Sequence, residues 1–254
     1  MAVKYSLCIT CFNEARTVHD SMESLVRQID DEFEIVVVDS FSNDGTYGIL
    51  QTFEKDPRVK VIQKKCNRGV GREIALENSN GAYIISNLDL DDIFLPNLNE
   101  FIEFYHSKCE GKLALINEDF GITTQNVMMA TREVLKELGG WRDLQWSEDW
   151  DLWCRAAKAQ KYAWTVFKLV DTVNRHYERR KTTKKIRVRY SLYRDMLRVG
   201  RQPFPKGERT SLGQRIVLFF ALLSWRFYPS YRDEFNKSFG PYDPKYYVQY
   251  VHDG

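Results

Sequence analysis

Four short apolar segments, separated by stretches with helical periodicity, restrict the folds open to this 254-residue chain. Each segment is apolar along most of its length, which is typical of strands covered on both faces. The stretches between them repeat apolar residues at helical spacing, as at Val18, Met22 and Leu25. This alternation predicts a right-handed, mostly parallel α/β sheet flanked by helices. The predicted strands are residues 4–12, 33–39, 59–64 and 82–89.

Polar residues stand at the ends of these predicted strands. Asn13, Asp39 and Asp89 end or directly follow the predicted strands 4–12, 33–39 and 82–89. Asn67 lies in the loop after the strand at 59–64. Ligands of parallel α/β sheets bind beyond the carboxyl ends of the strands. We therefore expect the four polar loops to meet in one ligand site.

Three carboxylates are crowded into the loop after residue 88. Asp89, Asp91 and Asp92 fall within four positions of the segment IISNLDLDDIFLP. Like charges this close repel, so without a partner at least one of them would take up a proton. A hard divalent cation with oxygen ligands, Mg²⁺ or Mn²⁺, removes that conflict and leaves positions for phosphate oxygens. The alternative is a solvated acidic turn that caps the next helix.

The pattern changes after residue 97. The spacing of apolar residues predicts helices at about 99–107, 132–138, 147–160 and 184–199, and strands within 112–117, 124–131 and 161–173. Ser147 is the expected N-cap of a helix with acids in its first turn. The Tyr-rich tail from Gly240 is expected to lie along the domain or a partner chain.

The composition describes a globular protein, with 43% hydrophobic and 28% charged residues. Its five cysteines are odd in number and scattered, which predicts free thiols in a reducing compartment. Cys8 and Cys11 form a CxxC, but no second pair completes a zinc site, and a strand offers no helix N-terminus to activate a thiol. The first residues lack the apolar core of a signal peptide, and no run is long enough to cross a bilayer. We expect a cytoplasmic protein.

The segment 175–232 is strongly basic. It carries 16 lysines and arginines against three acids, a net charge of +13, so the other residues carry −11 of the total +2. It also contains an unbroken apolar run, residues 216–223. Cations beside an apolar helix predict a peripheral anchor on an anionic membrane. Packing on the rest of the chain and an oligomer contact stay open; nucleic-acid binding is disfavoured, because nothing else resembles a nucleic-acid module.

The order of the motifs over about residues 4–177 resembles a family 2, GT-A type glycosyltransferase. The matching segments are SLCITCFNEA, VVVDSFSNDGT, NRGVGREIALENSNGAYI, NLDLDD and GGWRDLQWSEDWDLWCRA. The resemblance implies a GT-A (Rossmann-like) fold, a UDP- or GDP-sugar donor, Mn²⁺ or Mg²⁺ as cofactor, and inversion at the anomeric carbon. The chain departs from the family pattern at Thr10, Cys11 and Ser40, which replace Pro, Thr and Asp.

The resemblance also implies roles for single residues. Donor binding falls to Asp39 toward a base N–H, to Asn13 and Glu14 toward ribose, to Arg72 toward the diphosphate, and to Thr10 and Asp89. Arg68 is the alternative to Arg72. From the residues alone, Asp39 could instead cap a turn, and Arg72 could form a surface salt bridge.

The metal ligands implied are Asp89, Asp91 and His176, with Asp92 in reserve. Asp149 is the implied general base, because inverting transfer needs a carboxylate on the face opposite the leaving group; Glu148 is its competitor. Helix capping alone would also explain both acids. Of four nearby tryptophans, Trp150 and Trp153 are expected in the core, and Trp141 or Trp146 against a sugar ring.

The sequence thus predicts an inverting, metal-dependent hexosyltransferase that acts on a lipid-linked glycan or glycolipid at the inner face of the membrane. Residues 1–177 would form the catalytic domain, with a nucleotide half at about 1–97 and an acceptor half at 98–177, and residues 178–254 a basic helical extension. The alternatives are a nucleotidyltransferase, and a nucleotide-sugar-binding or membrane-scaffold protein without turnover.

Overall fold

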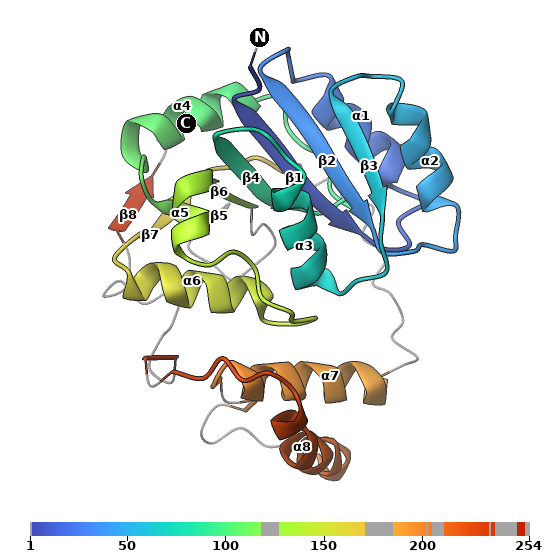
Figure 1. The fold of residues 1–254 in the computed structure, drawn as a ribbon, viewed down its shortest axis with the longest axis vertical. Helices are drawn as coiled ribbons and strands as arrows, with labels where there is room; N and C mark the ends of the chain where they lie inside the picture. The colour runs from blue at the N-terminus through green and yellow to red at the C-terminus, as the bar shows by residue number, and fades with distance from the viewer. Residues whose placement is uncertain are drawn as a thin grey trace.

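The computed structural model describes residues 2–117, 127–170, 185–201, 203–204, 211–233, 235–236 and 248–251. These residues form one eight-stranded sheet in the order β3-β2-β1-β4-β6-β5-β7-β8, with helices on both faces (Figure 1). The strands are β1 (Tyr5–Cys11), β2 (Phe33–Asp39), β3 (Val59–Gln63), β4 (Tyr83–Leu88), β5 (Leu113–Asn117), β6 (Val127–Thr131), β7 (Tyr162–Val166) and β8 (Val248–Val251).

The sheet is parallel except around β6. Strands β3, β2, β1 and β4 are parallel neighbours, as are β5, β7 and β8. Strand β6 lies antiparallel between β4 and β5 and so joins the two parallel groups. The predicted mostly parallel α/β sheet is confirmed, and the described residues of the tail, 248–251, lie along the domain as edge strand β8.

Alternate residues of the central strands supply two separate cores. In β2, Ile35 and Val37 point into one core, and Val36 and Val38 into the other. Burying each such side chain stabilises the fold by about 1.5–3 kcal/mol. The first core is closed by α1 (Val18–Val26), α2 (Thr46–Phe53) and α4 (Leu98–Lys108), and the second by α3 (Arg68–Glu77), α5 (Arg132–Glu137) and α6 (Glu148–Lys158).

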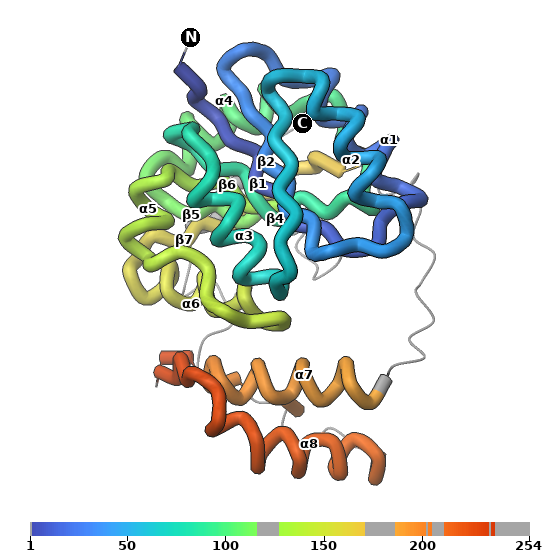
Figure 2. The backbone as a smooth tube through the Cα atoms, turned by 45° about the vertical axis from the view of Figure 1, so that its right-hand side comes forward, coloured from blue at the N-terminus to red at the C-terminus, as the bar shows by residue number. Residues whose placement is uncertain are grey.

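Two further helices, α7 (Lys185–Arg198) and α8 (Leu212–Ser224), lie beyond α6, and α8 is on the side of α7 away from the sheet (Figure 2). They share a small core of their own, formed by Tyr193, Met196, Val217 and Ala221. Helix α8 is followed by the short 3-10 helix η1 (Trp225–Phe227). No helix among the described residues is long and apolar enough to cross a membrane.

The two cysteines of the CxxC lie on opposite faces of β1. Cys8 belongs to the second core and Cys11 to the first, and both are free thiols. Burial raises the pKa of Cys8 to about 12 and, with the nearby Asp39 charge, raises the pKa of Cys11 as well. Neither thiol is therefore activated, in agreement with the prediction from the sequence.

Candidate active site

The loops after β1 and β2 are joined by hydrogen bonds at the carboxyl edge of the sheet. The backbone N–H of Asn13 donates to Ser42 Oγ at 2.9 Å, and Asn13 Oδ1 accepts from the N–H of Asn43 at 3.0 Å. The N–H of Glu14 donates to Thr46 Oγ1 at 2.8 Å. Asn13 has a positive φ of 60°, which asparagine tolerates better than most residues. The two loops therefore form one connected wall of the site.

Asp39 is completely buried at the end of β2 and organises the turn that follows. Its Oδ2 accepts from the N–H of Ser42 at 3.1 Å and from Gln63 Nε2 at 3.1 Å, and its Oδ1 accepts from the Ser42 hydroxyl. These contacts are those of the turn-capping alternative. A nucleobase N–H would have to replace one of these donors, so recognition of a base by Asp39 stays a prediction.

Thr10 faces the start of α3 rather than the loop edge. A Cβ built on Gly71 would lie 2.8 Å from Thr10 Cγ2, so the threonine methyl fills the space that the missing side chain leaves. This close contact holds α3 against β1. It gives Thr10 a packing function beside its predicted place in the donor site.

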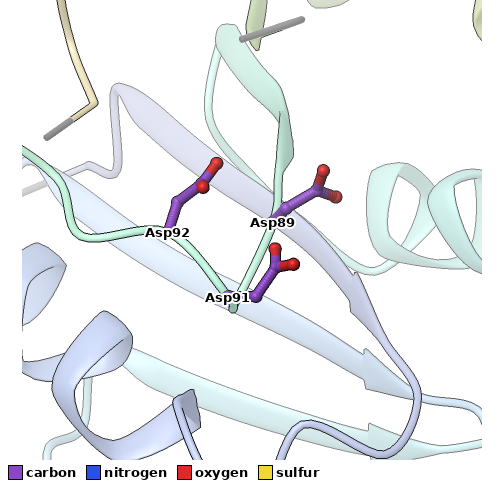
Figure 3. A group of neighbouring side chains, drawn as sticks. All are labelled: Asp89, Asp91 and Asp92. Atoms are coloured by element: carbon purple, nitrogen blue, oxygen red, sulfur yellow. The ribbon is translucent and has the colours of Figure 1, made fainter. Parts of the chain in front are cut away.

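The three aspartates after β4 are brought together as the sequence predicted. One carboxylate oxygen from each of Asp89, Asp91 and Asp92 lies within 4.8 Å of the others, and the side chains project from one loop (Figure 3). Asp89 is exposed, Asp91 half-buried and Asp92 buried. Three converging carboxylates are the hard oxygen donors that Mg²⁺ and Mn²⁺ take in proteins. The cluster therefore fits a divalent ion, whereas His176 lies outside the described residues.

A backbone irregularity at the end of β4 directly precedes these aspartates. Asn87 has a positive φ of 62°, and the pairing register with β1 shifts beside it, between Cys8 and Ile9. Such a bulge bends a strand and changes the direction of the residues that follow. Sequence periodicity does not report this shift.

Two arginines of α3 lie near the acids of α6 but in different surroundings. Arg72 is buried, and its Nη1 donates to Glu148 Oε1 at 2.7 Å. The ion-pair alternative for Arg72 is thus what the structure shows, although the pair is buried and not at the surface. Arg68 is 43% exposed, and its Nε lies 3.8 Å from the same Glu148 oxygen.

The carboxylates of the loop after β4 also affect the pKa of Arg68. Burial alone would lower the pKa of Arg68, but the carboxylates of Glu148, Asp89, Asp149 and Asp91 outweigh it and raise the pKa. These four acids come from two segments far apart in the sequence, the loop after β4 and the first turn of α6. Both arginines therefore lie near the same acid of α6, and the choice between Arg72 and its alternative Arg68 for a diphosphate stays a prediction.

Glu148 and Asp149 begin α6 and differ sharply in environment. Glu148 is 1% exposed, and burial together with the Asp149 charge raises its pKa to about 7 against the opposing effect of Arg72 and Arg68. Asp149 is half-buried, and its Oδ1 accepts from the N–H of Trp150 at 2.7 Å. Ser147 is the N-cap residue of this helix, as predicted, but it has a left-handed φ of 63° and its hydroxyl makes no capping hydrogen bond.

The loop before α6 rests on the start of α3. Asn67 caps α3 by accepting from the N–H of Val70 at 3.0 Å, and its amide donates to Asp143. The N–H of Gly69 donates to the carbonyl of Leu144 at 2.9 Å. A Cβ on Gly69 would lie 2.1 Å from the Arg142 carbonyl oxygen, so only glycine permits this approach.

The tryptophans divide between the core and the site. Trp150 and Trp153 are buried, as predicted, and Trp141 is buried as well, which removes it from contact with a sugar. Trp146 is half-buried, and the Arg68 guanidinium lies 5.3 Å from its ring centroid. Its indole Nε1 donates to Ser191 Oγ of α7 at 2.9 Å.

The contact of α7 with the site was not predicted from the sequence. Asp195, one of only three acids in the basic segment, is completely buried and accepts from the backbone N–H groups of Gln145 and Trp146. The sequence signal for such a contact was that Asp195 is an isolated acid among basic residues. Its partners could not be read from the sequence, because they lie about fifty residues away.

Residues 6–113 match the family model described as Glycosyl transferase family 2. Among curated proteins, the putative glycosyltransferase EpsE of Bacillus subtilis is 28% identical over 139 residues, which is 51% of this chain and 50% of EpsE. The chain spans half or less of the length of the first curated relatives that it matches. These matches support a family 2 glycosyltransferase.

Solved structures share the fold. Staphylococcus aureus TarS 1–349 in complex with UDP-GlcNAc is similar with a TM-score of 0.58 at 17% identity, over 87% of this chain and 72% of that one. The mannosyltransferase PcManGT from Pyrobaculum calidifontis, in complex with GDP-Man and Mn²⁺, gives 0.60 at 17% identity, over 89% and 72%. At this identity the likeness shows the fold alone, and it confirms the predicted fold class.

Proposed function

We propose that this chain is a family 2 glycosyltransferase that moves a hexosyl group from a nucleoside-diphosphate sugar to an acceptor hydroxyl, with inversion at the anomeric carbon. The family match and the UDP-GlcNAc and GDP-Man bound in similar folds support a nucleotide-sugar donor. One observation carries the proposal: the loop after β4 gathers one carboxylate oxygen from each of Asp89, Asp91 and Asp92 within 4.8 Å of one another. Arg68 of α3, whose Nε lies 3.8 Å from Glu148 Oε1 in the first turn of α6, is the cation proposed to bind beside them. In this arrangement Arg68 would bind the diphosphate, and the acids of α6 would face the acceptor.

The metal site is the loop after β4. Asp89, Asp91 and Asp92 would hold Mn²⁺ or Mg²⁺, and His176 is a further predicted ligand. Such an ion, when bound, neutralises charge on the departing diphosphate as a Lewis acid. The carboxylates lie within 4.8 Å of one another, a spacing that suits one shared cation.

The donor lies across the ends of β1, β2 and β4. The guanidinium of Arg68 binds diphosphate oxygens through its planar set of N–H donors. Thr10, Asn13, Glu14 and Asp39 line the nucleoside side. Arg72 contributes indirectly, because its ion pair fixes Glu148 beneath Arg68.

Asp149 is the general base. It takes the proton of the acceptor hydroxyl while the acceptor oxygen attacks the anomeric carbon from the face opposite the nucleotide. The bond between the anomeric carbon and the diphosphate oxygen breaks, and its electron pair leaves with the diphosphate. Asp149 is half-buried, which leaves its carboxylate within reach of an acceptor.

The acceptor is a lipid-linked glycan or glycolipid, and the protein acts at the cytoplasmic face of an anionic membrane. Helix α8 supports this, because Phe219, Phe220 and Leu223 are each 56% exposed and only Val217 and Ala221 are buried along it. Residues 1–177 form the catalytic domain in this proposal, and residues 178–254 form the extension that reaches the membrane. The boundary between them lies outside the described residues.

The direct test is turnover of UDP- and GDP-sugars with Mn²⁺, followed by NMR. We expect a nucleoside diphosphate and a glycoside of inverted configuration, and no product after chelation of the metal. Asp149→Asn should lower kcat about 10²- to 10⁴-fold, the usual contribution of a general base. Asp233→Asn, which removes an exposed partner of Lys158, serves as control.

Three outcomes would contradict this proposal in different ways. Pyrophosphate as the released product would identify a nucleotidyltransferase. Saturable binding of a nucleotide sugar without turnover would identify a binding protein. Wild-type turnover by Asp149→Asn would remove Asp149 as the base.

A further inference from the structure

We propose that Asp195 of α7 is a positioning residue for the active site, which makes the basic extension a working part of the catalytic machinery. The inference rests on the proposed function and adds to it a residue that touches neither donor nor metal. It assigns to α7 the task of fixing the loop of residues 145–147, which leads directly into Glu148 and Asp149.

The Asp195 carboxylate is divided between two sets of donors. Oδ2 accepts from the backbone N–H of Gln145 at 3.0 Å and of Trp146 at 3.3 Å. Oδ1 accepts from Arg194 Nε at 2.8 Å and from Arg198 Nη1 at 3.2 Å. The side chain is completely buried, so these contacts are shielded from water and the two arginines balance its charge.

A second contact from α7 reaches the same loop. Ser191, one helical turn before Asp195, accepts from the indole Nε1 of Trp146 at 2.9 Å and donates to the carbonyl of Val188. The Trp146 ring in turn lies 5.3 Å from the Arg68 guanidinium. Helix α7 therefore supports both sides of the site, the loop that carries the base and the cation proposed to bind the diphosphate.

The loop needs such support because its backbone adopts an unfavourable conformation at Ser147. Ser147 has a φ of 63°, a conformation that residues other than glycine keep only when the surroundings enforce it. On the α3 side, the N–H of Gly69 holds the carbonyl of Leu144. On the other side, Asp195 holds the next two N–H groups. Asp149 follows within three residues, so its position depends on both contacts.

Asp195→Asn tests this role with little change of shape. The amide keeps one acceptor oxygen but places N–H donors against either the backbone N–H groups or the arginines. We expect kcat to fall about ten- to a hundredfold, the effect of a small misplacement of a catalytic group. The affinity for Mn²⁺, followed by the electron paramagnetic resonance of the free ion, should stay that of the wild type. Ser191→Ala should show the same pattern to a smaller degree.

Hydrogen exchange gives a readout that is independent of turnover. Amides of residues 144–150 should exchange faster in Asp195→Asn than in the wild type without any ligand, while those of β1 and β2 do not change. Asp233→Asn is the control, because it removes an acid from the same C-terminal region that pairs with Lys158 at the far end of α6.

The outcomes separate this inference from the proposed function. Wild-type kcat and wild-type exchange in Asp195→Asn would overturn the positioning role, even if the melting temperature fell. Absence of turnover in the wild type would instead refute the proposed function. In that case the exchange of residues 144–150 still decides whether Asp195 holds the loop.

Discussion

Two arginines one helical turn apart illustrate how much depends on single contacts. Arg72 is buried against Glu148 at 2.7 Å, whereas Arg68 is 43% exposed and its Nε lies 3.8 Å from the same carboxylate. The same residue type therefore forms a buried ion pair at one position and, in the proposed function, binds the diphosphate at the other. Their helical spacing places them on one face of α3, which is why the sequence could not distinguish them.

Arg68→Ala should reduce activity with little loss of stability, whereas Arg72→Ala should reduce stability. Without Arg68 the donor loses charge-assisted hydrogen bonds of about 1.5–3 kcal/mol, so kcat/KM should fall about ten- to a hundredfold while stability changes little. At pH 8 or above, where Glu148 is mostly charged beside Arg72, removal of Arg72 leaves that buried group without its close partner, and the free energy of unfolding should fall, by up to about 3–5 kcal/mol. Urea denaturation and donor kinetics on both variants check this; equal stability losses would contradict it.

Glu148 should make stability depend on pH. Its pKa rises from 4.5 to about 7 on folding, because burial and Asp149 disfavour the charged form. The folded state then holds the proton more tightly than the unfolded state. The resulting stabilisation is complete below pH 4.5 and is lost as the pH rises through 7, with a slope of up to about 1.4 kcal/mol per pH unit. Denaturation of wild type and Glu148→Gln from pH 4.5 to 8 measures this slope.

The control for this measurement is Glu137→Gln, which removes an exposed glutamate that pairs with Lys161. Its pH dependence should follow the wild type. If Glu148→Gln also keeps the wild-type slope, the proton on Glu148 does not contribute to folding.

At the scale of elements, the backbone of α3 packs very closely against the loop before α6 at Gly69. Gly69→Ala would bring a methyl group within 2.1 Å of the Arg142 carbonyl, so the loop must move. We expect a loss of about 1–3 kcal/mol in stability, as for other overpacked positions, together with reduced turnover. Gly48→Ala in α2 is the matched control. Nothing lies within 4 Å of its added Cβ, so it should stabilise α2 by up to about 1 kcal/mol.

Periodicity predicted the elements but not their partners. The strands β1 to β4 and helices α1, α4, α6 and α7 occur close to the predicted residues, because each carries its own apolar spacing. The antiparallel place of β6 between β4 and β5 depends on long-range pairing, which spacing does not encode. The acidic cluster was predictable because its members share one loop. Asp195 was not, since its partners belong to another segment.

Local rules also failed where the site strains the backbone. Ser147 is the N-cap residue of α6, yet it has a left-handed φ and its hydroxyl makes no capping hydrogen bond. Such exceptions concentrate at functional sites, where surrounding contacts override local preference. Here the overriding contacts come from Gly69 on α3 and Asp195 on α7.

At the scale of the whole molecule, α8 presents an apolar face that the described residues do not cover. Replacing Phe219 and Leu223, each 56% exposed, by serine should weaken binding to anionic vesicles. Two partly buried side chains of this size are worth about 2–3 kcal/mol in a membrane interface, or about thirty- to a hundredfold in affinity. Vesicle flotation measures the change, and added salt should weaken binding further, because the cations contribute.

Ile186→Ser is the matched control, since this residue is even more exposed but begins α7. Its flotation should equal that of the wild type. If the double variant still floats but changes from dimer to monomer in light scattering, the face of α8 is an oligomer contact instead.

The position of α7 in the chain affects the nascent protein. The loop of Asp89, Asp91 and Asp92 leaves the ribosome more than a hundred residues before Asp195, and domains begin to fold from the amino end during synthesis. In a growing chain the three aspartates can therefore come together before Asp195 is available to hold the segment that precedes α6. Translation alone would then delay the proposed transfer until Asp195 has emerged, well after the segments proposed to bind the nucleotide.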